Sequence, residues 1–193
     1  VIEITKQLNS FFPNQISPKI VANIGGFSMD KPFNEKQKQE HYNRFFESLD
    51  RLNMDGVEII PQTMAPFPWH FGGQRYQNLF VHVDEIVSLC KEYNLKMCFD
   101  VSHSMLTSNH FGYDFYEFAE KIAPFSSHIH MGDASGTNGE GLQIGDGEID
   151  FDRLGKILKQ KAPSSTFIPE IWQGHKNDGE GFFIALEKLE NKL

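Results

Sequence analysis

The stretch KMCFDVSHSMLTSNHFGYDFYEFAEKIAPFSSHIHMGD, residues 96–133, decides the fold. Its two ends, 96–102 and 127–131, are short segments rich in apolar and β-branched residues and bounded by turn residues, a pattern typical of strands. Between them, Asp114 and Glu117 resemble a capping box, and apolar residues follow at helical spacing. The stretch therefore predicts a strand, a helix and a second strand, the unit from which parallel sheets are built.

The same alternation runs through the rest of the chain. A capping box of Asn34 and Gln37 predicts a helix after the first strand, and Asp150 is placed to cap another. Alternating strands and helices predict a parallel sheet covered by helices, with right-handed crossovers. An opening helix precedes the five predicted strands, which occupy residues 20–25, 57–61, 96–102, 127–131 and 166–172.

The spacing of polar residues on these strands indicates the kind of sheet. Glu58, Asp100, His130 and Glu170 follow one another at steps of 42, 30 and 40 residues, close to the ~31 residues per unit of an eight-unit barrel of ~250 residues. An open fragment of five units would leave two unpaired edges. We therefore predict a single α/β domain over residues 1–193, a partial (β/α) TIM barrel of the five C-terminal βα units. The missing first units are expected from upstream sequence or a partner chain.

Composition excludes several classes of protein. The chain carries 26 Asp plus Glu against 18 Lys plus Arg, a net charge of -8, which repels a phosphate backbone and argues against nucleic acid as a partner. No run approaches the ~20 apolar residues of a membrane span, so we expect no membrane association and a soluble, cytoplasmic protein. Cys90 and Cys98 lie in apolar contexts and are expected to be buried free thiols.

Four of the predicted strands carry a titratable residue: Glu58, Asp100, His130 and Glu170. Strands of a parallel barrel are buried on both faces, so such residues need a reason. Each alone has a structural explanation, such as an ion pair, a loop cap or a hydrogen bond in the core. Together in one barrel mouth they would repel or desolvate one another unless a cation held them. Oxygen and nitrogen ligands suit Mn²⁺, Mg²⁺, Co²⁺ or Zn²⁺.

The order of these residues resembles the xylose-isomerase-like barrel superfamily, which includes ketose 3-epimerases, hydroxypyruvate isomerases, inosose dehydratases and a barrel class of apurinic endonucleases. The resemblance covers roughly residue 20 onward, with family-like loops at 71–74 and 145–151. It implies that Glu58, Asp100, His130 and Glu170 ligate the metal, and it favours His130 over His128 on the same strand. The pattern reads Glu58, Asp100-Val-Ser-His103, His130-Met-Gly-Asp133 and Glu170.

The resemblance also implies a mechanism. In the epimerases and isomerases of this family, two metal-bound glutamates on opposite sides of the substrate exchange a proton at a carbon beside a carbonyl. Glu58 and Glu170 would be this catalytic pair, unless one of them is a ligand only, and His103 would contact substrate oxygens or a second metal. The implied function is a divalent-metal-dependent isomerase or epimerase of a sugar, sugar phosphate or sugar acid, acting through an enediolate.

Two loops that follow metal-bearing strands are expected to bind substrate, because barrel enzymes place substrate-binding groups there. Trp69 and Trp172 are candidates to stack on a sugar face, and His175 and Lys176 to meet a phosphate or carboxylate. Ordinary loop packing and solvated charge explain the same four residues equally well.

Two other functions compete with the isomerase reading. Residues 170–183 are similar to barrel domains of bacterial proteins that also carry a sialic-acid-type synthase, which suggests a non-catalytic or regulatory sugar-binding domain of a larger nonulosonate-biosynthesis protein. An apurinic endonuclease is disfavoured, because Asn23 and Gly25 stand where those enzymes present a histidine and no Asp-x-His follows Asp133.

Overall fold

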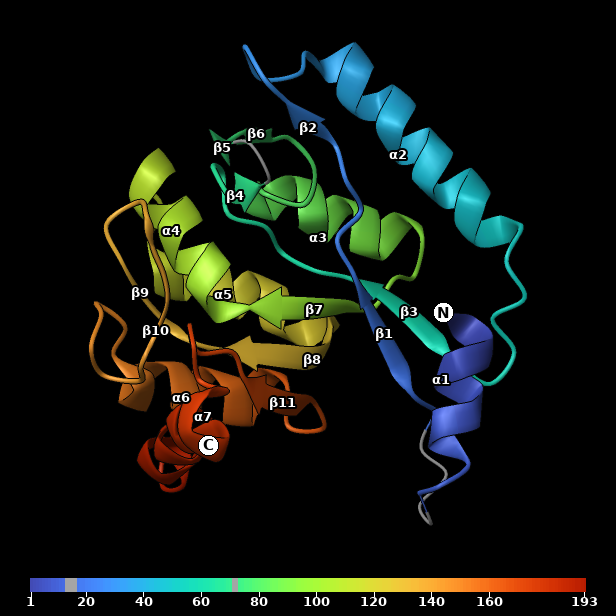
Figure 1. Cartoon of the computed structure of the whole chain (residues 1–193). Helices are drawn as coiled ribbons and strands as arrows, with labels where there is room; N and C mark the ends of the chain where they lie inside the picture. Colours follow the sequence, from blue (N-terminus) through green and yellow to red (C-terminus); the bar gives the residue numbers. More distant parts are fainter. Residues whose placement is uncertain (13–16, 71–72) are drawn as a thin grey trace.

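The computed structural model describes residues 1–12, 17–70 and 73–193. It confirms the predicted α/β partial barrel, because five parallel strands lie in chain order with helices on their outer side (Figure 1). One pair and one three-stranded sheet are joined by a single parallel bridge between Gln62 and Cys98. The pair is β1 (Lys19–Ala22) with β3 (Glu58–Pro61), and the sheet is β7 (Met97–Asp100), β8 (Ser126–Met131) and β11 (Thr166–Pro169).

Short antiparallel pairs occupy the loops between these strands. Their two to four residues are too few to show the alternation by which a strand is recognised in a sequence. The pair that follows β8 lies beside the carboxyl ends of β7 and β11. The pairs are β2 (Phe27–Ser28) with β6 (Tyr76–Gln77), β4 (Trp69–His70) with β5 (Gly73–Gln74), and β9 (Asp133–Ser135) with β10 (Gly139–Leu142).

Several helices begin at the predicted caps. Asn34 and Gln37 form both hydrogen bonds of the capping box at α2 (Glu35–Asp50). Asp114 and Asp150 each accept two backbone N–H groups, at the starts of α5 (Phe115–Ile122) and α6 (Phe151–Lys161). Such caps satisfy N–H groups that have no partner inside the helix. The other helices are α1 (Ile2–Asn9), α3 (Val83–Glu92), α4 (Val101–Phe111), α7 (Lys176–Leu189) and the 3₁₀ turn η1 (Ala123–Phe125).

The structure corrects three strand ends and adds a helix. The predicted strand 20–25 stops at Ala22. The predicted strand 96–102 stops at Asp100, whose carboxylate accepts the backbone N–H of His103 at 2.9 Å and so caps α4. Stretch 96–133 therefore holds two helices between its strands, not one. The predicted strand 166–172 stops at Pro169. At the last two of these ends, the strand stops at or directly before a predicted ligand, Asp100 or Glu170.

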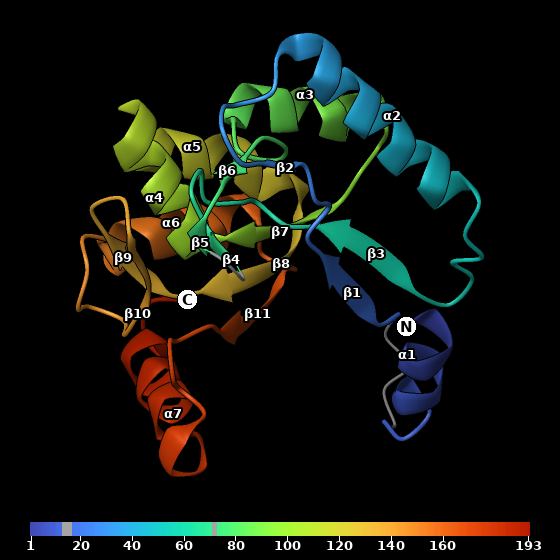
Figure 2. The ribbon, with the colours of Figure 1, turned by 45° about the horizontal axis from the view of Figure 1, so that its top comes forward.

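The row of parallel strands is open at both ends. Among the described residues, β1 pairs only with β3 and β11 only with β8. Figures 1 and 2 show α1 and α7 well apart, each beside one of the two outer strands. The gap between the outer strands agrees with a barrel that lacks some of its units. None of the helices in the described part of the chain has the length and apolar content of a membrane-spanning helix.

The core lies between the sheet and α3, α5 and α6. Phe99 of β7, Phe118 of α5 and Leu154 of α6 are at most 2% exposed, and each buried side chain of this size contributes about 2–3 kcal/mol through removal of apolar surface from water. Cys90 and Cys98 are buried free thiols, as predicted. The helices on the outer side therefore fix the sheet from which the polar residues project.

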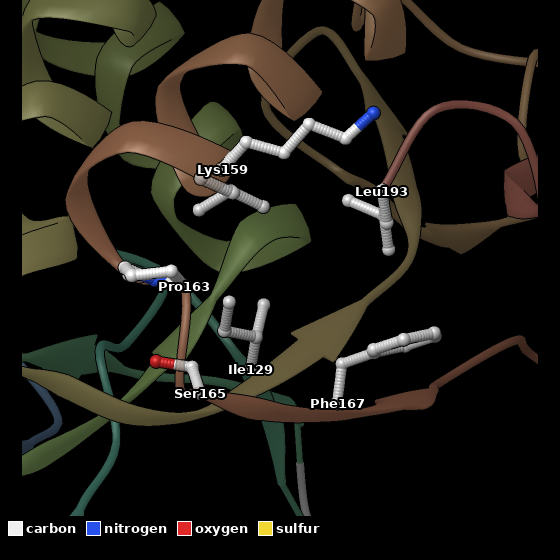
Figure 3. Close-up of a pocket in the computed structure, with 8 residues that line it drawn as sticks. Ile129, Lys159, Pro163, Ser165, Phe167 and Leu193 are labelled. Atoms are coloured by element: carbon white, nitrogen blue, oxygen red, sulfur yellow. The ribbon is translucent and has the colours of Figure 1, made fainter.

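An apolar cavity of about 180 Å³ lies on the outer face of the sheet, beside α6 and the C-terminal residue. Figure 3 shows Ile129 and Phe167 below Lys159 and Leu193. Ile129 and Phe167 are register partners on β8 and β11, and side chains alternate between the two faces of a strand. The cavity is therefore on the face opposite to His130.

Leu154→Ala should lower the free energy of unfolding by about 3 kcal/mol, because it leaves a cavity in a region that cannot easily collapse. Leu8→Ala makes the same change at a residue 57% exposed on α1 and should cost less than about 1 kcal/mol. Urea unfolding followed by circular dichroism measures both values. Equal losses in the two variants would contradict this location of the core.

Candidate metal centre

Three predicted ligands meet at the carboxyl ends of β7, β8 and β11. Asp100 and Ile168 are both register partners of His130, so their side chains share one face of the sheet. Glu170 lies two residues beyond Ile168 and points to the same side. One ligand atom from each of Asp100, His130 and Glu170 lies within 4.8 Å of the others. The parallel register thus brings together residues 30 to 70 positions apart in the sequence.

The imidazole of His130 lies between the two carboxylates. Its Nδ1 is 2.5 Å from Glu170 Oε2 and 3.6 Å from Asp100 Oδ2, yet this buried nitrogen forms no hydrogen bond of acceptable geometry with any described residue. His130 is 8% and Asp100 2% exposed, whereas Glu170 is about half exposed. Buried polar atoms are normally paired. Two carboxylates and an imidazole nitrogen without an aligned partner fit the donor set of a divalent cation.

Burial lowers the pKa of His130, but its contacts with Asp100, Cys98 and Glu170 outweigh burial and raise the pKa to about 12. At neutral pH the ring of His130 is therefore protonated in the metal-free protein. The proton neutralises part of the charge that a cation would neutralise.

Several groups around Asp100 hold the carboxylate in place. Thr63 Oγ1 accepts the N–H of Asp100 at 2.8 Å and donates to its carbonyl at 3.1 Å, and Ser104 Oγ donates to the same carbonyl at 2.7 Å. Gln62 Nε2 lies 3.2 Å from Asp100 Oδ2. Outer partners of this kind orient the groups that ligate metals. Gln62 was not predicted to belong to the site, although it follows the end of β3 just as Glu170 follows the end of β11.

The structure does not bring Glu58 to this group. Glu58 is the first residue of β3 and pairs with Lys19, four residues before Gln62, which bridges to Cys98. Four residues of strand span about 13 Å. Glu58 is therefore on the same face of the sheet as Gln62 but at the amino end of β3. At the carboxyl end, where the sequence predicts a fourth ligand, the structure places Gln62 instead. This arrangement does not support Glu58 as a ligand or catalytic residue.

His103 lies in the first turn of α4, next to the predicted ligands. Its Nδ1 is 2.9 Å from the carbonyl of Thr63, and its Nε2 is 3.0 Å from Glu140 Oε1. Burial lowers the pKa of His103, but the charge of Asp100 and the hydrogen bond with Glu140 raise it overall, to about 9. A protonated ring donates to both oxygens at once. His103 thus connects Asp100 to a second carboxylate, that of Glu140.

Three of the four loop residues predicted to bind substrate line one cavity of about 500 Å³. Trp172 and His175 come from the segment after β11 and Lys176 from the first position of α7, and Glu170 and Glu140 line the same cavity. Trp172 is 77% exposed, and Lys176 Nζ donates to Gln173 Oε1 at 2.8 Å. The fourth, Trp69, belongs to β4, and its side chain lies outside the described residues. Glu140 was not predicted, because nothing in its glycine-rich surroundings marks it.

His128 differs from His130 in its surroundings. Its Nδ1 forms a hydrogen bond with Thr166 Oγ1 at 2.7 Å, and its ring lies edge-on to that of His130, with 5.3 Å between centroids. Burial, followed by the positive charge of His130, lowers the pKa of His128 to about 4. His128 is therefore a neutral, hydrogen-bonded neighbour of the three candidate ligands.

Solved structures with a similar fold include a D-tagatose 3-epimerase-like protein, a D-psicose 3-epimerase and a zinc-bound protein. A D-tagatose 3-epimerase-like protein has a TM-score of 0.67 at 21% identity, over 98% of this chain and 66% of that one. A D-psicose 3-epimerase with D-tagatose, from Clostridium cellulolyticum H10, has a TM-score of 0.62 at 14% identity, over 90% and 63%. The IolI protein, solved with a zinc atom, has a TM-score of 0.67 at 14% identity, over 91% and 64%.

The chain thus spans about two thirds of the length of these structures, and identities this low show the fold alone. No curated protein matches the sequence. The family is shown by a separate comparison, which extends over almost the whole sequence. Residues 2–191 match the xylose isomerase-like TIM barrel family, and the chain therefore belongs to that family.

Proposed function

We propose that this chain binds a divalent cation through Asp100, His130 and Glu170 and that the site isomerises or epimerises a small sugar or sugar acid. The observation that carries the proposal is the buried Nδ1 of His130, which lies between two carboxylates without an aligned hydrogen bond. This nitrogen lies at the carboxyl ends of parallel strands, where barrel enzymes place their active sites.

The donor set supports a catalytic rather than a closed structural site. Two carboxylates and one imidazole leave coordination positions of Mn²⁺, Mg²⁺, Co²⁺ or Zn²⁺ for solvent or substrate. When bound, such a cation polarises a carbonyl and stabilises negative charge on enediolate oxygens. Glu170 is half exposed and lines the cavity, so its carboxylate can take a proton from a carbon beside that carbonyl.

The surrounding residues fit a polyhydroxylated substrate. The exposed indole of Trp172 offers a flat apolar face to a sugar ring. His175 and Lys176 lie on the rim of the same cavity and would meet a carboxylate or phosphate on the substrate. His103 would hold substrate oxygens if Glu140 gives up its contact. The similar epimerase structures support this substrate class, and the net charge of -8 argues against nucleic acid as a partner.

Mn²⁺ should raise the melting temperature, because it binds the folded state preferentially; at a concentration of 100 times Kd the gain is about 2.7 kcal/mol. Glu170→Gln should remove most of this gain, whereas Glu187→Gln, the same change at an exposed position of α7, should leave it intact. Differential scanning calorimetry with and without Mn²⁺ checks both variants. A melting temperature that does not change when Mn²⁺ is added would count against the site.

Metal affinity should rise with pH. The pKa of His130 is raised to about 12 in the metal-free protein, so at neutral pH its proton must leave before Nδ1 can ligate a cation. Titration calorimetry at pH 6 and pH 8 should show tighter Mn²⁺ binding at pH 8. Buffers of different ionisation enthalpy should show release of about one proton per metal bound. Affinity that is independent of pH would mean that His130 is not a ligand.

Turnover should introduce solvent deuterium into the substrate at the carbon beside its carbonyl. The Mn²⁺-loaded protein is incubated in D₂O with ketohexoses, ketopentoses, hydroxypyruvate and hexuronates, and each compound is followed by proton NMR. Binding of a sugar with retention of every carbon-bound hydrogen would instead favour a sugar-binding domain without catalysis. Metal-dependent incision of abasic-site DNA would favour a phosphodiesterase.

A further inference from the structure

Inversion at a carbon beside a carbonyl needs one group that removes a proton and a second group that returns it on the other side. Glu170 is placed for the first role, but the structure leaves Glu58 far down β3. Glu140 and Glu170 line the same cavity. We infer that Glu140 is the second catalytic residue and that the reaction is therefore an epimerisation, an inference that rests on the proposed function.

Backbone hydrogen bonds fix Glu140 relative to two of the ligands. Its neighbour Gly141 donates its N–H to Ser102 Oγ at 2.9 Å and accepts the N–H of Trp172 at 2.7 Å. Ser102 lies two residues after Asp100, and Trp172 lies two residues after Glu170. The β9–β10 hairpin is thus attached on one side to the element that carries Asp100 and on the other to the segment that carries Glu170.

The close approach at this attachment requires glycine. Gly141 has a φ of +63°, and a Cβ added there would lie 3.3 Å from the backbone nitrogen of Trp172. Left-handed φ values are unfavourable for residues with a Cβ. The backbone position of Glu140 is therefore fixed independently of its side-chain rotamer.

The base of the hairpin is held by one carboxylate. Asp133, the first residue of β9, is 0% exposed and accepts the backbone N–H groups of Ala134, Gly145, Gly147 and Ile149 at 2.8 to 3.2 Å. These four hydrogen bonds hold together the excursion, which is the segment 132–150 between β8 and α6. A rigid support of this kind is what a catalytic side chain needs in order to keep its geometry.

The side chain of Glu140 is oriented but still reaches the cavity. Its Oε1 is 3.0 Å from Nε2 of His103, whose Nδ1 is held by the carbonyl of Thr63. The Glu140 side chain is 43% exposed, so it can exchange protons with water. Glu140 thus has the two properties that a proton-transfer group requires: a fixed direction and access to solvent.

The reaction balances with these two carboxyl groups. The Glu170 carboxylate removes the proton from the carbon beside the carbonyl, and the C–H electron pair moves into the enediolate. Glu140 takes the proton of His103 Nε2, with which it is in contact, and delivers it to the opposite face of that carbon; a new C–H bond forms, the carbonyl is restored, and His103 regains a proton from water. The substrate loses one proton and gains one, and Glu170 releases its proton to water.

The test compares Glu140→Gln with Glu148→Gln in the Mn²⁺-loaded protein. Glu148 lies in the same excursion and bonds Asn109 and Gly136, but it does not line the cavity. D-Tagatose and D-psicose are incubated in D₂O, and NMR separates epimer formation from deuterium uptake without inversion. Elemental analysis of each variant measures bound Mn²⁺, and circular dichroism checks its folding.

Glu140→Gln should bind Mn²⁺ like the wild type, form the epimer at least about 100-fold more slowly, and still take up deuterium without inversion through Glu170. Glu148→Gln should resemble the wild type. Epimerisation that is equal in both variants would overturn the role of Glu140, as would loss of Mn²⁺ together with activity, which indicates a positioning residue. Absence of deuterium uptake by the metal-loaded wild type from these two sugars and from the ketopentoses, hydroxypyruvate and hexuronates of the wider screen would overturn the proposed function itself, and this inference with it.

Discussion

The hydrogen-bond register between β7, β8 and β11 is the constraint on which the candidate centre depends. Asp100 pairs with His130, and His130 with Ile168, so a shift of one residue in either strand would move a ligand to the outer face. That face is occupied by Ile129 and Phe167, which line an apolar cavity (Figure 3). Packing on the outer side therefore protects the register on which the polar side depends.

Asp100 joins the fold to the chemistry. It ends β7, caps α4 through the N–H of His103, and presents its other oxygen toward His130. The carboxylate is 2% exposed, and the charge on His130 and His103 compensates its burial. Without a cation these protonated rings stabilise the carboxylates. With one, His130 must release its proton, so the site exchanges one positive charge for another.

The sequence was sufficient to predict the existence of the strands and three polar residues that meet at their carboxyl ends; metal ligation by these residues stays a prediction. Apolar runs, helix caps and spacing predicted the five parallel strands, and Asp100, His130 and Glu170 do meet. Strand ends were less predictable, because Asp100 is compatible with both a strand and a helix cap, and only the fold decides between them. Glu58 lies away from this group for a related reason: periodicity identifies the inward face of a strand but not which end of the strand carries the site.

Glu140 and Gln62 were missed for different physical reasons. Gln62 is uncharged and follows β3 directly, so nothing in the sequence marked it, although its amide contacts both Asp100 and His103. Glu140 lies in a hairpin whose path depends on hydrogen bonds to Ser102 and Trp172, 38 and 32 residues away in the sequence. Contacts of that separation leave no local pattern that a reader of the sequence can use.

The open edge of the sheet has a consequence for local stability. β11 is paired on one side only, and segments with few neighbours open more readily than the interior of a fold. Asp100 and His130 belong to the two strands that lie further inside, whereas Glu170 follows the outer one. A cation bound by all three residues would link β11, the outer strand that opens most readily, to β7 and β8, which open less readily. Loss of the ion would then loosen the edge of the sheet as well as disable the chemistry.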